Sequence, residues 1–459
     1  MGVGSRLSSR VEKDLLSIFL SIEIGLSLLI CLSPLFIYGL AGFTQYIHIL
    51  IYTLAALVGC AIGFEIPLVI RLNEGYEGLN RNISSIMSYD YVGSLVGGLA
   101  FAFIGLPFLG IKNSAFLFGM FNLLAALTVV IVFWDKLKVI KFRVSLFLGL
   151  AFLILSAGFI KSDSIKMYGE QSRFKDKIVH VAESKYQKLV VTTWLEKHWL
   201  YINGNLQMTT LDEYLYHEPM IHPVMSLVED PKNILIIGGG DGFNAKELLK
   251  YEAIETIELV DLDPEMTKLG AAFAPFVEAN QGSLSRHKLT VLNEDGFVFL
   301  QESNSFYDLI VIDLPDAKGV DLSKLYSKEF YQMIKLHLRP NGYMVTQSGN
   351  PYLATRAFEC IKKTMQNVGF NIAPIHNHVI SMGEWSWVIG SKDLTSTQLK
   401  SRLEQGTYSD IETRWLNQES VKMMLNFGKP LEDTAGVEVN TINNPVLYQY
   451  QLNGNWGHY

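Results

Sequence analysis

Acidic residues follow four apolar, strand-like runs in the second half of the chain, where they are suited to bind an amine and remove a proton from it. Asp241 follows NILII, Asp261 ends TIELVD, Asp295 follows KLTVLNE, and Asp313 with Asp316 follows YDLIVI. The carboxyl ends of parallel strands meet at one edge of a sheet, and ligands bind at that edge. We therefore expect these side chains to share the rim of one binding site.

The first of these acids lies in a glycine-rich turn, IGGGDG, at residues 237–242. Gly238 and Gly240 allow the backbone to approach a ligand closely. The carboxylate of Asp241 would repel a pyrophosphate and attract an amine or a sulfonium cation. The turn therefore favours a cationic substrate over NAD or ATP, and a solvated loop acid is the alternative.

The next two acidic positions suit a nucleoside. An acid at the end of the second strand, here Asp261, typically accepts hydrogen bonds from ribose hydroxyls. Asp263 competes for this role, or serves as the N-cap of the following helix. Asp295 suits the adenine amino group and Gly296 leaves room for the ring, and a helix N-cap at Asp295 is an equally good alternative.

The last pair forms a small anionic well. Asp313 and Asp316 lie on a loop after the fourth strand, and two carboxylates so placed would bind a diamine. The acid at the strand end, Asp313, is placed to take a proton from an ammonium group so that the free amine can attack. Solvated loop acids are the alternative, and the three other acids on the same rim make it the weaker one.

The segments between these acids alternate between strand-like and helix-like patterns, as in a doubly wound, mostly parallel sheet. We therefore predict a C-terminal α/β Rossmann-like domain, of the class I methyltransferase type, over residues 226–392. Residues 164–225 are rich in Val, Ile, Tyr and Trp and predict a small β-strand subdomain. Residues 393–459 are polar and irregular, and are expected to form a lid or tail.

The first third of the chain predicts an α-helical transmembrane bundle over residues 1–160. The whole chain is 49% hydrophobic and 18% charged, and almost no charge falls between residues 14 and 160. A span needs about 20 apolar residues. We expect about five spans, at 15–40, 46–71, 88–111, 113–134 and 144–160. Three acids, Glu23, Glu65 and Asp90, lie in or beside these spans, and an intramembrane acid is a candidate functional residue.

The charges in the loops place the N-terminus inside the cell, because basic residues precede the first span and follow the second and fourth. Five spans would then place the soluble domain outside, whereas a nucleoside substrate would require it in the cytoplasm. We therefore predict a multi-pass cell-membrane protein and leave the side of its soluble domain open. The net charge of −7 argues against a nucleic-acid partner, and the three scattered cysteines indicate neither a disulfide framework nor a metal site.

The order of these motifs resembles that of the spermidine synthase family. The resemblance is carried by ILIIGGGDGFNAKELLKY, IELVDLDP, NEDGF, YDLIVIDLPD and LYSKEFY, and by SKYQKLVVT and LYINGNLQMTTLDEYLYHEPMIHP upstream. The membrane half, with GFEIPLVIR, is similar to that of bacterial membrane-anchored members. The resemblance implies a polyamine aminopropyltransferase. Such an enzyme transfers the aminopropyl group of decarboxylated S-adenosylmethionine to putrescine or another polyamine and releases methylthioadenosine.

The resemblance also assigns a role to each matching position. It implies nucleoside binding by Gln187, Asp261, Asp295, Gly296, Gly238 and Gly240. It implies polyamine binding by Tyr216, His217, Asp241 and Asp316, with Asp313 as the general base. The co-substrate takes the place of any cofactor, no metal is needed, and a homodimer is expected.

Departures from the family pattern leave the acceptor open. Phe243 replaces a second paired glycine after the glycine-rich turn, and Ala317 and Val320 replace prolines in the loop after the fourth strand. Two alternatives remain. One is an S-adenosylmethionine-dependent methyltransferase, which shares the fold. The other is a non-catalytic membrane sensor of polyamines or nucleosides.

Overall fold

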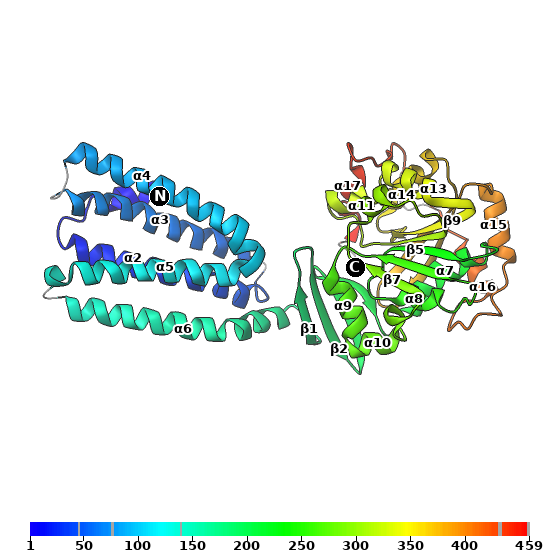
Figure 1. Ribbon diagram of the computed structural model, residues 1–459, viewed down its shortest axis with the longest axis horizontal. Coiled ribbons are helices and arrows are strands. Elements are labelled where there is room, and N and C mark those ends of the chain that lie inside the picture. Colours follow the sequence, from blue (N-terminus) through cyan, green and yellow to red (C-terminus); the bar gives the residue numbers. More distant parts are fainter. Residues whose placement is uncertain (45, 75–77, 138–139, 430–433, 457–459) are drawn as a thin grey trace. The chain divides into compact units, whose positions relative to one another are not determined.

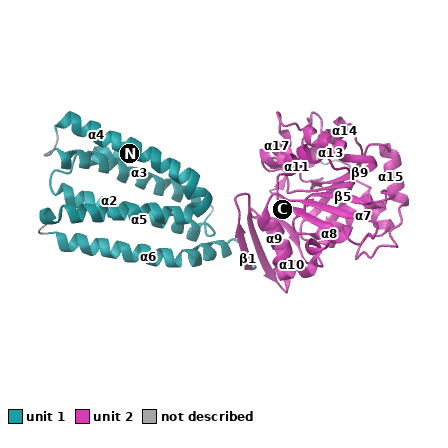
Figure 2. Ribbon diagram, viewed as in Figure 1, with its two compact units in different colours: residues 1–177 teal, residues 178–459 magenta. Residues whose placement is uncertain are grey.

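The computed structural model describes residues 1–44, 46–74, 78–137, 140–429 and 434–456. The chain divides into two compact units, residues 1–177 and 178–459 (Figure 1, Figure 2). The first unit is helical and apolar, and the second carries all the strand-end acids. The predicted boundary at residue 160 lies inside the last helix of the first unit.

The first unit consists of long helices that lie alongside one another (Figure 1). Buried residues such as Leu20, Cys31, Leu68, Phe116 and Leu155 form its core. The elements are α1 (Gly2–Ser8), α2 (Leu15–Leu40), α3 (Ile47–Asn73), α4 (Leu79–Ala100), the π-helix η1 (Phe101–Leu109), α5 (Gly110–Val132), the short η2 (Trp134–Leu137) and α6 (Lys141–Gln171). Many of their remaining apolar side chains are exposed, as expected for a bundle that faces lipid.

In the part of the chain that the structure describes, four helices are long and apolar enough to cross a membrane, whereas we expected about five spans. The difference comes from a 54-residue run, Leu79–Val132, which contains the two predicted spans 88–111 and 113–134. Gly110 has a φ of 70° between η1 and α5, and α4 and α5 are separate helices of the bundle rather than one continuous helix (Figure 1). The weakest predicted span, 144–160, lies within the 31-residue helix α6.

Two of the three acids predicted to lie in or beside the spans, Glu23 and Glu65, come close to each other. Glu23 of α2 is 4% exposed, and its carboxyl group lies within hydrogen-bonding distance of that of Glu65 on α3. Asn122 of α5 donates to the backbone oxygen of Glu23 at 3.0 Å. Glu23 therefore faces the interior of the bundle.

The second unit begins with a small antiparallel sheet of order β1–β2–β3–β4. Its strands are β1 (Lys177–Glu183), β2 (Lys188–Trp194), β3 (Lys197–Ile202) and β4 (Asn205–Thr209). The Asn203–Gly204 turn between β3 and β4 has positive φ at both residues, which is the geometry of a tight hairpin. The predicted strand region was too wide. Residues 164–171 belong to α6, and Tyr214–Met225 form the helix α7. α7 is buried on every side, so its sequence shows no helical period.

The larger sheet has the order β10–β11–β9–β8–β5–β6–β7. Its strands are β5 (Asn233–Gly238), β6 (Thr256–Val260), β7 (Leu289–Leu292), β8 (Tyr307–Asp313), β9 (Leu338–Gly349), β10 (Asn371–Val379) and β11 (Gly383–Ser391). The pairs among β5 to β9 are parallel, and β10 and β11 add an antiparallel hairpin at one edge. The predicted mostly parallel sheet is confirmed, although the hairpin was not foreseen.

Helices cover both faces of this sheet, and alternate residues of each central strand point to opposite cores. Ile234 and Ile236 of β5 join one core, and Leu235 and Ile237 join the other. The helices of this unit are α7 (Tyr214–Met225), α8 (Phe243–Leu248), α9 (Pro264–Ala272), α10 (Ala274–Ala279), α11 (Gly296–Glu302), α12 (Val320–Lys324), α13 (Lys328–His337), α14 (Thr355–Asn367), α15 (Ser396–Gln405), α16 (Gln418–Met424) and α17 (Val446–Leu452). Because both faces are covered, the strands are continuous apolar runs.

The C-terminal segment is more regular than predicted. The predicted irregular stretch contains α15, α16 and α17, and Leu399, Leu403, Val421 and Met424 are buried. Asn440 is fully buried and donates from Nδ2 to the backbone oxygen of Ser323 at 2.7 Å. The sequence contained a signal for helix α15, because Thr395 begins a capping box and Leu399 and Leu403 are four residues apart.

Candidate active site

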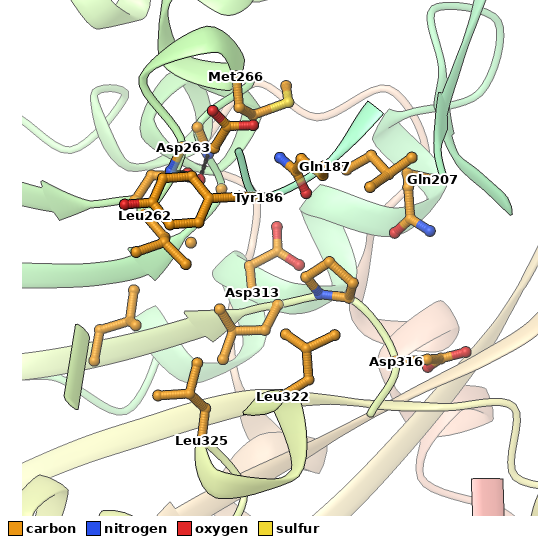
Figure 3. A pocket seen from close by; sticks show the side chains of 18 of the residues that line it. Tyr186, Gln187, Gln207, Leu262, Asp263, Met266, Asp313, Asp316, Leu322 and Leu325 are labelled. Carbon is orange, nitrogen blue, oxygen red and sulfur yellow. Dashed lines mark hydrogen bonds between the residues drawn. The ribbon is translucent and has the colours of Figure 1, made fainter. Parts of the chain in front are cut away.

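The acids predicted to form a rim meet where the strand order reverses, between β5 and β8. Gly238 and Asp313 are directly paired at the ends of these two strands. A cavity of about 610 Å³ opens there, lined by every residue assigned to the site from the sequence. In Figure 3, Asp313 lies near the middle of the cavity, with Leu262 and Asp263 toward one end and Asp316 toward the other. Strand ends at a switch point are where ligands bind in such sheets.

The glycine-rich turn passes so close to its neighbours that side chains are excluded. Gly238 has a φ of +83°, and a Cβ atom there would lie 2.0 Å from the backbone oxygen of Asp313. A Cβ atom on Gly240 would lie 2.6 Å from Oδ2 of Asp261. The backbone N–H of Gly240 donates to that same oxygen at 3.0 Å. The turn thus positions two of the acids in addition to approaching a ligand.

Asp313 is held by two side-chain donors. The hydroxyl of Tyr216 donates to Oδ1 at 2.7 Å, and Nδ2 of Asn244 donates to Oδ2 at 2.6 Å. Burial and the nearby charge of Asp241 raise the pKa of Asp313 to about 6, and these hydrogen bonds and His217 act against the rise. A carboxyl group with a pKa near the working pH accepts and releases protons well.

Asp241 and His217 lie on the same side of the cavity. Burial raises the pKa of Asp241, although His217 and the backbone N–H of Phe243, which donates to Oδ1 at 3.0 Å, act against this. His217 stacks on Phe243 and contacts the backbone oxygen of Glu213 through Nδ1 at 2.8 Å. Burial lowers the pKa of His217, but Glu213 and Asp241 outweigh burial and raise it. The site therefore has a surplus of negative charge.

Two roles, ligand binding and helix N-capping, were considered for the acids at the end of the second strand, and the structure gives them to different residues, Asp261 and Asp263. Asp261 faces the cavity and accepts from the N–H groups of Gly240 and Asp263. Burial raises its pKa to about 6 despite these two bonds. Asp263 is the N-cap of α9, accepting from the N–H of Glu265, and it also accepts from Ser184 Oγ at 3.0 Å. Ser184 begins the loop that presents Gln187 to the cavity, so this contact ties the small sheet to the site.

Asp295 serves the structural role that was left as an alternative. Its Oδ1 accepts from the N–H of Phe297 at 2.7 Å as the N-cap of α11, while Oδ2 lies 3.5 Å from Nζ of Lys324. It still lines the cavity. A Cβ atom on Gly296 would lie 2.7 Å from Cγ2 of Ile237, so this glycine is needed for α11 to pack on β5.

Asp316 lies at the other end of the cavity, where the C-terminal segment contributes. Burial raises its pKa to about 6, against the charge of Lys318 and the nearby side-chain amides of Gln451 and Gln347. Gln451 belongs to α17 and is 3% exposed. Gln347 also donates to Tyr326 Oη at 2.5 Å and to the backbone oxygen of Leu314 at 2.7 Å. The buried amide side chains of Gln347 and Gln451 thus help to hold the loop after β8 in place.

Several residues of the cavity were not found from the sequence. They are Tyr186, Asn205, Gln207, Lys318, Leu322, Leu325 and Trp385. Two residues behind the lining were also missed, Asn244, which donates to Asp313, and Gln347, which donates to the backbone oxygen of Leu314. Trp385 belongs to the hairpin strand β11 and lies 6.3 Å from the ring of Tyr216. It could not be placed because that hairpin was not predicted. Asn244 follows the glycine-rich turn, and its position at the start of α8 was the available signal.

The arrangement suits the transfer of a group to an amine. It combines an anionic cavity, a buried carboxyl group with a pKa of about 6, and apolar lining from Leu262, Leu322 and Leu325. In the described residues no group of three or more His, Cys, Asp or Glu side chains is placed to hold a metal ion. These side chains can position substrates, transfer protons and stabilise cations electrostatically.

Comparison with known proteins gives a consistent result. The spermine/spermidine synthase domain matches residues 213–401. The polyamine aminopropyltransferase of Oceanobacillus iheyensis is 34% identical over 98% of this chain and 87% of its own length. Polyamine aminopropyltransferase 2 of Aquifex aeolicus is 36% identical over 98% of this chain and 89% of its own. The similarity therefore includes the helical unit as well as the cavity.

Solved structures extend the comparison to the fold. A crystal structure of spermidine synthase in complex with the transition-state analogue AdoDATO matches with a TM-score of 0.50 and 21% sequence identity. The match covers 55% of this chain and 86% of that one. At this identity the likeness supports the Rossmann-like fold of the second unit and nothing more specific.

Proposed function

The chain belongs to the spermine/spermidine synthase family of polyamine aminopropyltransferases, and we propose that it transfers the aminopropyl group of decarboxylated S-adenosylmethionine to a polyamine. The single observation that carries this proposal is the placement of Asp313. It lies between Asp261 and Asp316 in one cavity, with two hydrogen-bond donors fixing its carboxyl group. A base in the middle of an anionic cavity is what deprotonation of a bound ammonium requires.

The proposed reaction is a displacement at carbon. The amine nitrogen uses its lone pair to form a bond to the methylene carbon next to the sulfonium, and the carbon–sulfur bond breaks. Its electron pair goes to sulfur, which leaves as the neutral thioether methylthioadenosine. The proton lost from the attacking amine goes to Asp313 and then to solvent. Because the sulfonium is a good leaving group, the protein mainly positions the reactants.

We assign the two ends of the cavity to the two substrates. Asp261 and Gln187 would hold the ribose, with Asp295 at the adenine, where Leu262 and Leu322 supply apolar walls. Asp241 would attract the amine of the aminopropyl arm. His217, Tyr216 and Asp316 would line the acceptor end. Putrescine or a related polyamine is the acceptor class that fits a cavity with carboxylates at both ends.

Product analysis with one substitution tests the proposal. Detergent-purified full-length protein is incubated with decarboxylated S-adenosylmethionine and putrescine, and methylthioadenosine and the extended amine are measured by mass spectrometry. Asp313→Asn keeps the shape of the side chain and removes the base, so turnover should fall by about 10²–10⁴-fold. Calorimetry should show that this variant still binds the nucleoside.

Asp230→Asn is the matched control, because it removes one carboxylate from an exposed position of the same unit. It should behave as the wild type. Methyl transfer from S-adenosylmethionine, with no aminopropyl product, would replace the proposal by the methyltransferase alternative. Nucleoside binding without any turnover in the wild type would replace it by the sensor alternative.

We further propose that the helices of the first unit hold the enzyme in the cell membrane, with the second unit in the cytoplasm. The support is the length and apolar composition of four helices in the described chain, together with a nucleoside substrate made inside cells. Protease added outside intact cells should leave the second unit uncut and should cut it after lysis. Cleavage in intact cells would place the second unit outside, as the loop charges with five spans predict.

A further inference from the structure

A cation stands at the acceptor end of the cavity, beside Asp316. Lys318 lines the cavity two residues beyond Asp316, and its charge lowers the pKa of that carboxyl group. Asp313 is shifted instead by burial, Asp241 and His217. The charge of Lys318 is therefore felt at the distal end of the acceptor site rather than at the reacting centre.

Lys318 is held between two segments that are far apart in the sequence. Its Nζ donates to Oδ1 of Asn205, in strand β4, at 2.9 Å. The same Nζ lies 5.3 Å from the ring centroid of Trp456, near the C-terminus. A lysine with both a hydrogen bond and a cation–π contact has less freedom to move away than an ordinary exposed lysine.

The C-terminal partner of Lys318 is itself anchored. Trp456 donates from Nε1 to the backbone oxygen of Gln451 at 2.6 Å, and the N–H of Asn455 donates to the backbone oxygen of Leu353 at 2.8 Å. Gln451 contacts Asp316, so the same segment holds the carboxylate and the cation beyond it. Nε2 of Gln451 is buried and makes no hydrogen bond in the described part of the chain, and its effect on the pKa of Asp316 places it near that carboxyl group.

We propose that Lys318 selects a diamine as the acceptor and rejects a polyamine with a third ammonium group. This inference rests on the proposed aminopropyl transfer. A diamine would place its attacking nitrogen at Asp313 and its distal ammonium at Asp316. It has no further ammonium group that could reach Lys318. A longer polyamine would place one more positive charge beside Nζ of Lys318, and like charges at this range repel.

Two points of chemistry follow from the geometry. The cation strengthens the ionised form of Asp316, which improves its attraction for the one ammonium that reaches it. The same cation raises the free energy of a bound triamine, because the additional ammonium would lie beside a like charge. Selection therefore depends on the charge of Lys318 rather than on the shape of its side chain.

The test compares putrescine with spermidine as acceptors in the purified full-length protein. Wild type should use spermidine with a kcat/KM about 10-fold or more below that for putrescine. Lys318→Gln keeps a donor for Asn205 and removes the charge. The ratio of kcat/KM for putrescine to kcat/KM for spermidine should therefore fall about 10-fold, mainly through a lower KM for spermidine. Lys318→Glu should narrow it further, and Lys318→Arg should keep the ratio of the wild type.

Lys400→Gln is the matched control, because it removes the same charge from a half-exposed position on α15. A loss of stability would change kcat/KM for both acceptors alike and would leave the ratio of the two values unchanged. The proposal is overturned if spermidine equals putrescine in the wild type, or if Lys318→Gln and Lys318→Arg show the same ratio. Absence of methylthioadenosine with every amine would instead overturn the aminopropyl transfer itself.

Discussion

Tyr216 of helix α7 donates a hydrogen bond of 2.7 Å to Oδ1 of Asp313 at the end of strand β8, although the two residues are far apart in the sequence. Burial raises the pKa of the Tyr216 phenol well above its usual value, so the hydroxyl stays protonated and remains a donor. The bond orients the carboxyl group and stabilises its ionised form. Together with the hydrogen bond from Asn244 to Oδ2, this bond restricts the motion of the carboxyl group.

The substitution Tyr216→Phe should therefore shift the pH dependence of the reaction. Loss of the hydrogen bond removes support for the carboxylate, so the pKa of Asp313 should rise above about 6. The base must be ionised to accept a proton, and the acidic limb of kcat/KM should move to higher pH by about one unit. At pH 6 the loss of activity should be about 5-fold, and it should shrink as the pH rises.

Rate profiles from pH 5 to 9 check this prediction, with Tyr168→Phe, an exposed hydroxyl on α6, as control. Asn244→Ala should shift the limb in the same direction, because it removes the other donor. A fall in activity that is equal at every pH would show that Tyr216 acts only on packing.

Asp261→Ala should weaken nucleoside binding and leave the amine dependence intact. Asp261 lies at the end of the cavity that we assign to the nucleoside, and a carboxylate that accepts two ribose hydrogen bonds would contribute on the order of 10–100-fold in affinity. Calorimetric titration with methylthioadenosine measures the effect, and the KM for putrescine is the comparison. A change confined to the KM for putrescine would reverse the assignment of the two ends.

Ser184→Ala tests whether the small sheet positions the nucleoside side of the site. Ser184 Oγ donates to Asp263 at 3.0 Å and caps the loop that carries Gln187. Without it the loop should loosen, and the KM for the nucleoside co-substrate should rise about 3- to 10-fold at an unchanged kcat. An equal loss in kcat would place the loop in the chemical step, contrary to our assignment.

Gly240→Ala should have a similar effect by another route. The new Cβ atom would lie 2.6 Å from Oδ2 of Asp261 and 3.1 Å from Cγ of Met266, so the carboxylate must move. We expect about 10-fold weaker nucleoside binding. Gly428→Ala is the matched control, since no heavy atom lies within 4 Å of the added methyl group. Unchanged nucleoside binding in Gly240→Ala would mean that binding does not depend on the observed position of the Asp261 carboxylate.

The sequence was informative where one residue's place follows from the strand before it. Asp241, Asp261, Asp313 and Asp316 were predicted to meet because the ends of neighbouring parallel strands share an edge. The N-cap role of Asp263 was likewise among the local alternatives, and the structure selects it.

The remaining parts depend on contacts between distant segments, which no local pattern encodes. Gln451 reaches Asp316 only because the C-terminal segment folds back over α14, and Trp385 enters the cavity on a hairpin that was not predicted. Helix α7 was missed because it is buried all round. The cluster of Glu213, Lys246 and Glu247 beneath His217 also joins two elements, and its ion pairs of 2.8 and 3.2 Å could not be read from spacing.

The surplus of buried acid should make the second unit more stable as the pH falls from 7 toward 5. The carboxyl groups of Asp261, Asp313 and Asp316 each have a pKa raised to about 6, mainly by burial, above the 3.8 of an exposed aspartate. The folded protein therefore binds protons between about pH 6 and pH 4 that the unfolded chain does not. Where the folded state binds more protons, the free energy of unfolding rises as the pH falls.

His198 opposes this trend in the same window, because burial lowers its pKa, but it is one group against the three aspartates. The pKa of Glu247 is lowered to about 2, with burial outweighed by His222 and Lys246, so its contribution is lost only below the pKa of an unfolded glutamate. The raised pKa of His217 acts in the same direction as the three aspartates, since its stabilisation is lost as the pH rises through the folded pKa. Each aspartate should contribute about 1 kcal/mol between pH 7 and pH 5.

Tryptophan fluorescence measures this, because of the seven tryptophans only Trp134 lies in the first unit. Chemical unfolding of detergent-purified protein at pH 7, 6 and 5 should give midpoints that rise as the pH falls. In Asp313→Asn the rise should be smaller, because one of the three groups no longer titrates, and stability at pH 7 should be at least that of the wild type. Midpoints that fall from pH 7 to pH 5 in the wild type would mean that these carboxyl groups are already stabilised as anions. In that case the base at Asp313 would be ionised well below pH 6, and the predicted acidic limb of the rate profile would have to move with it.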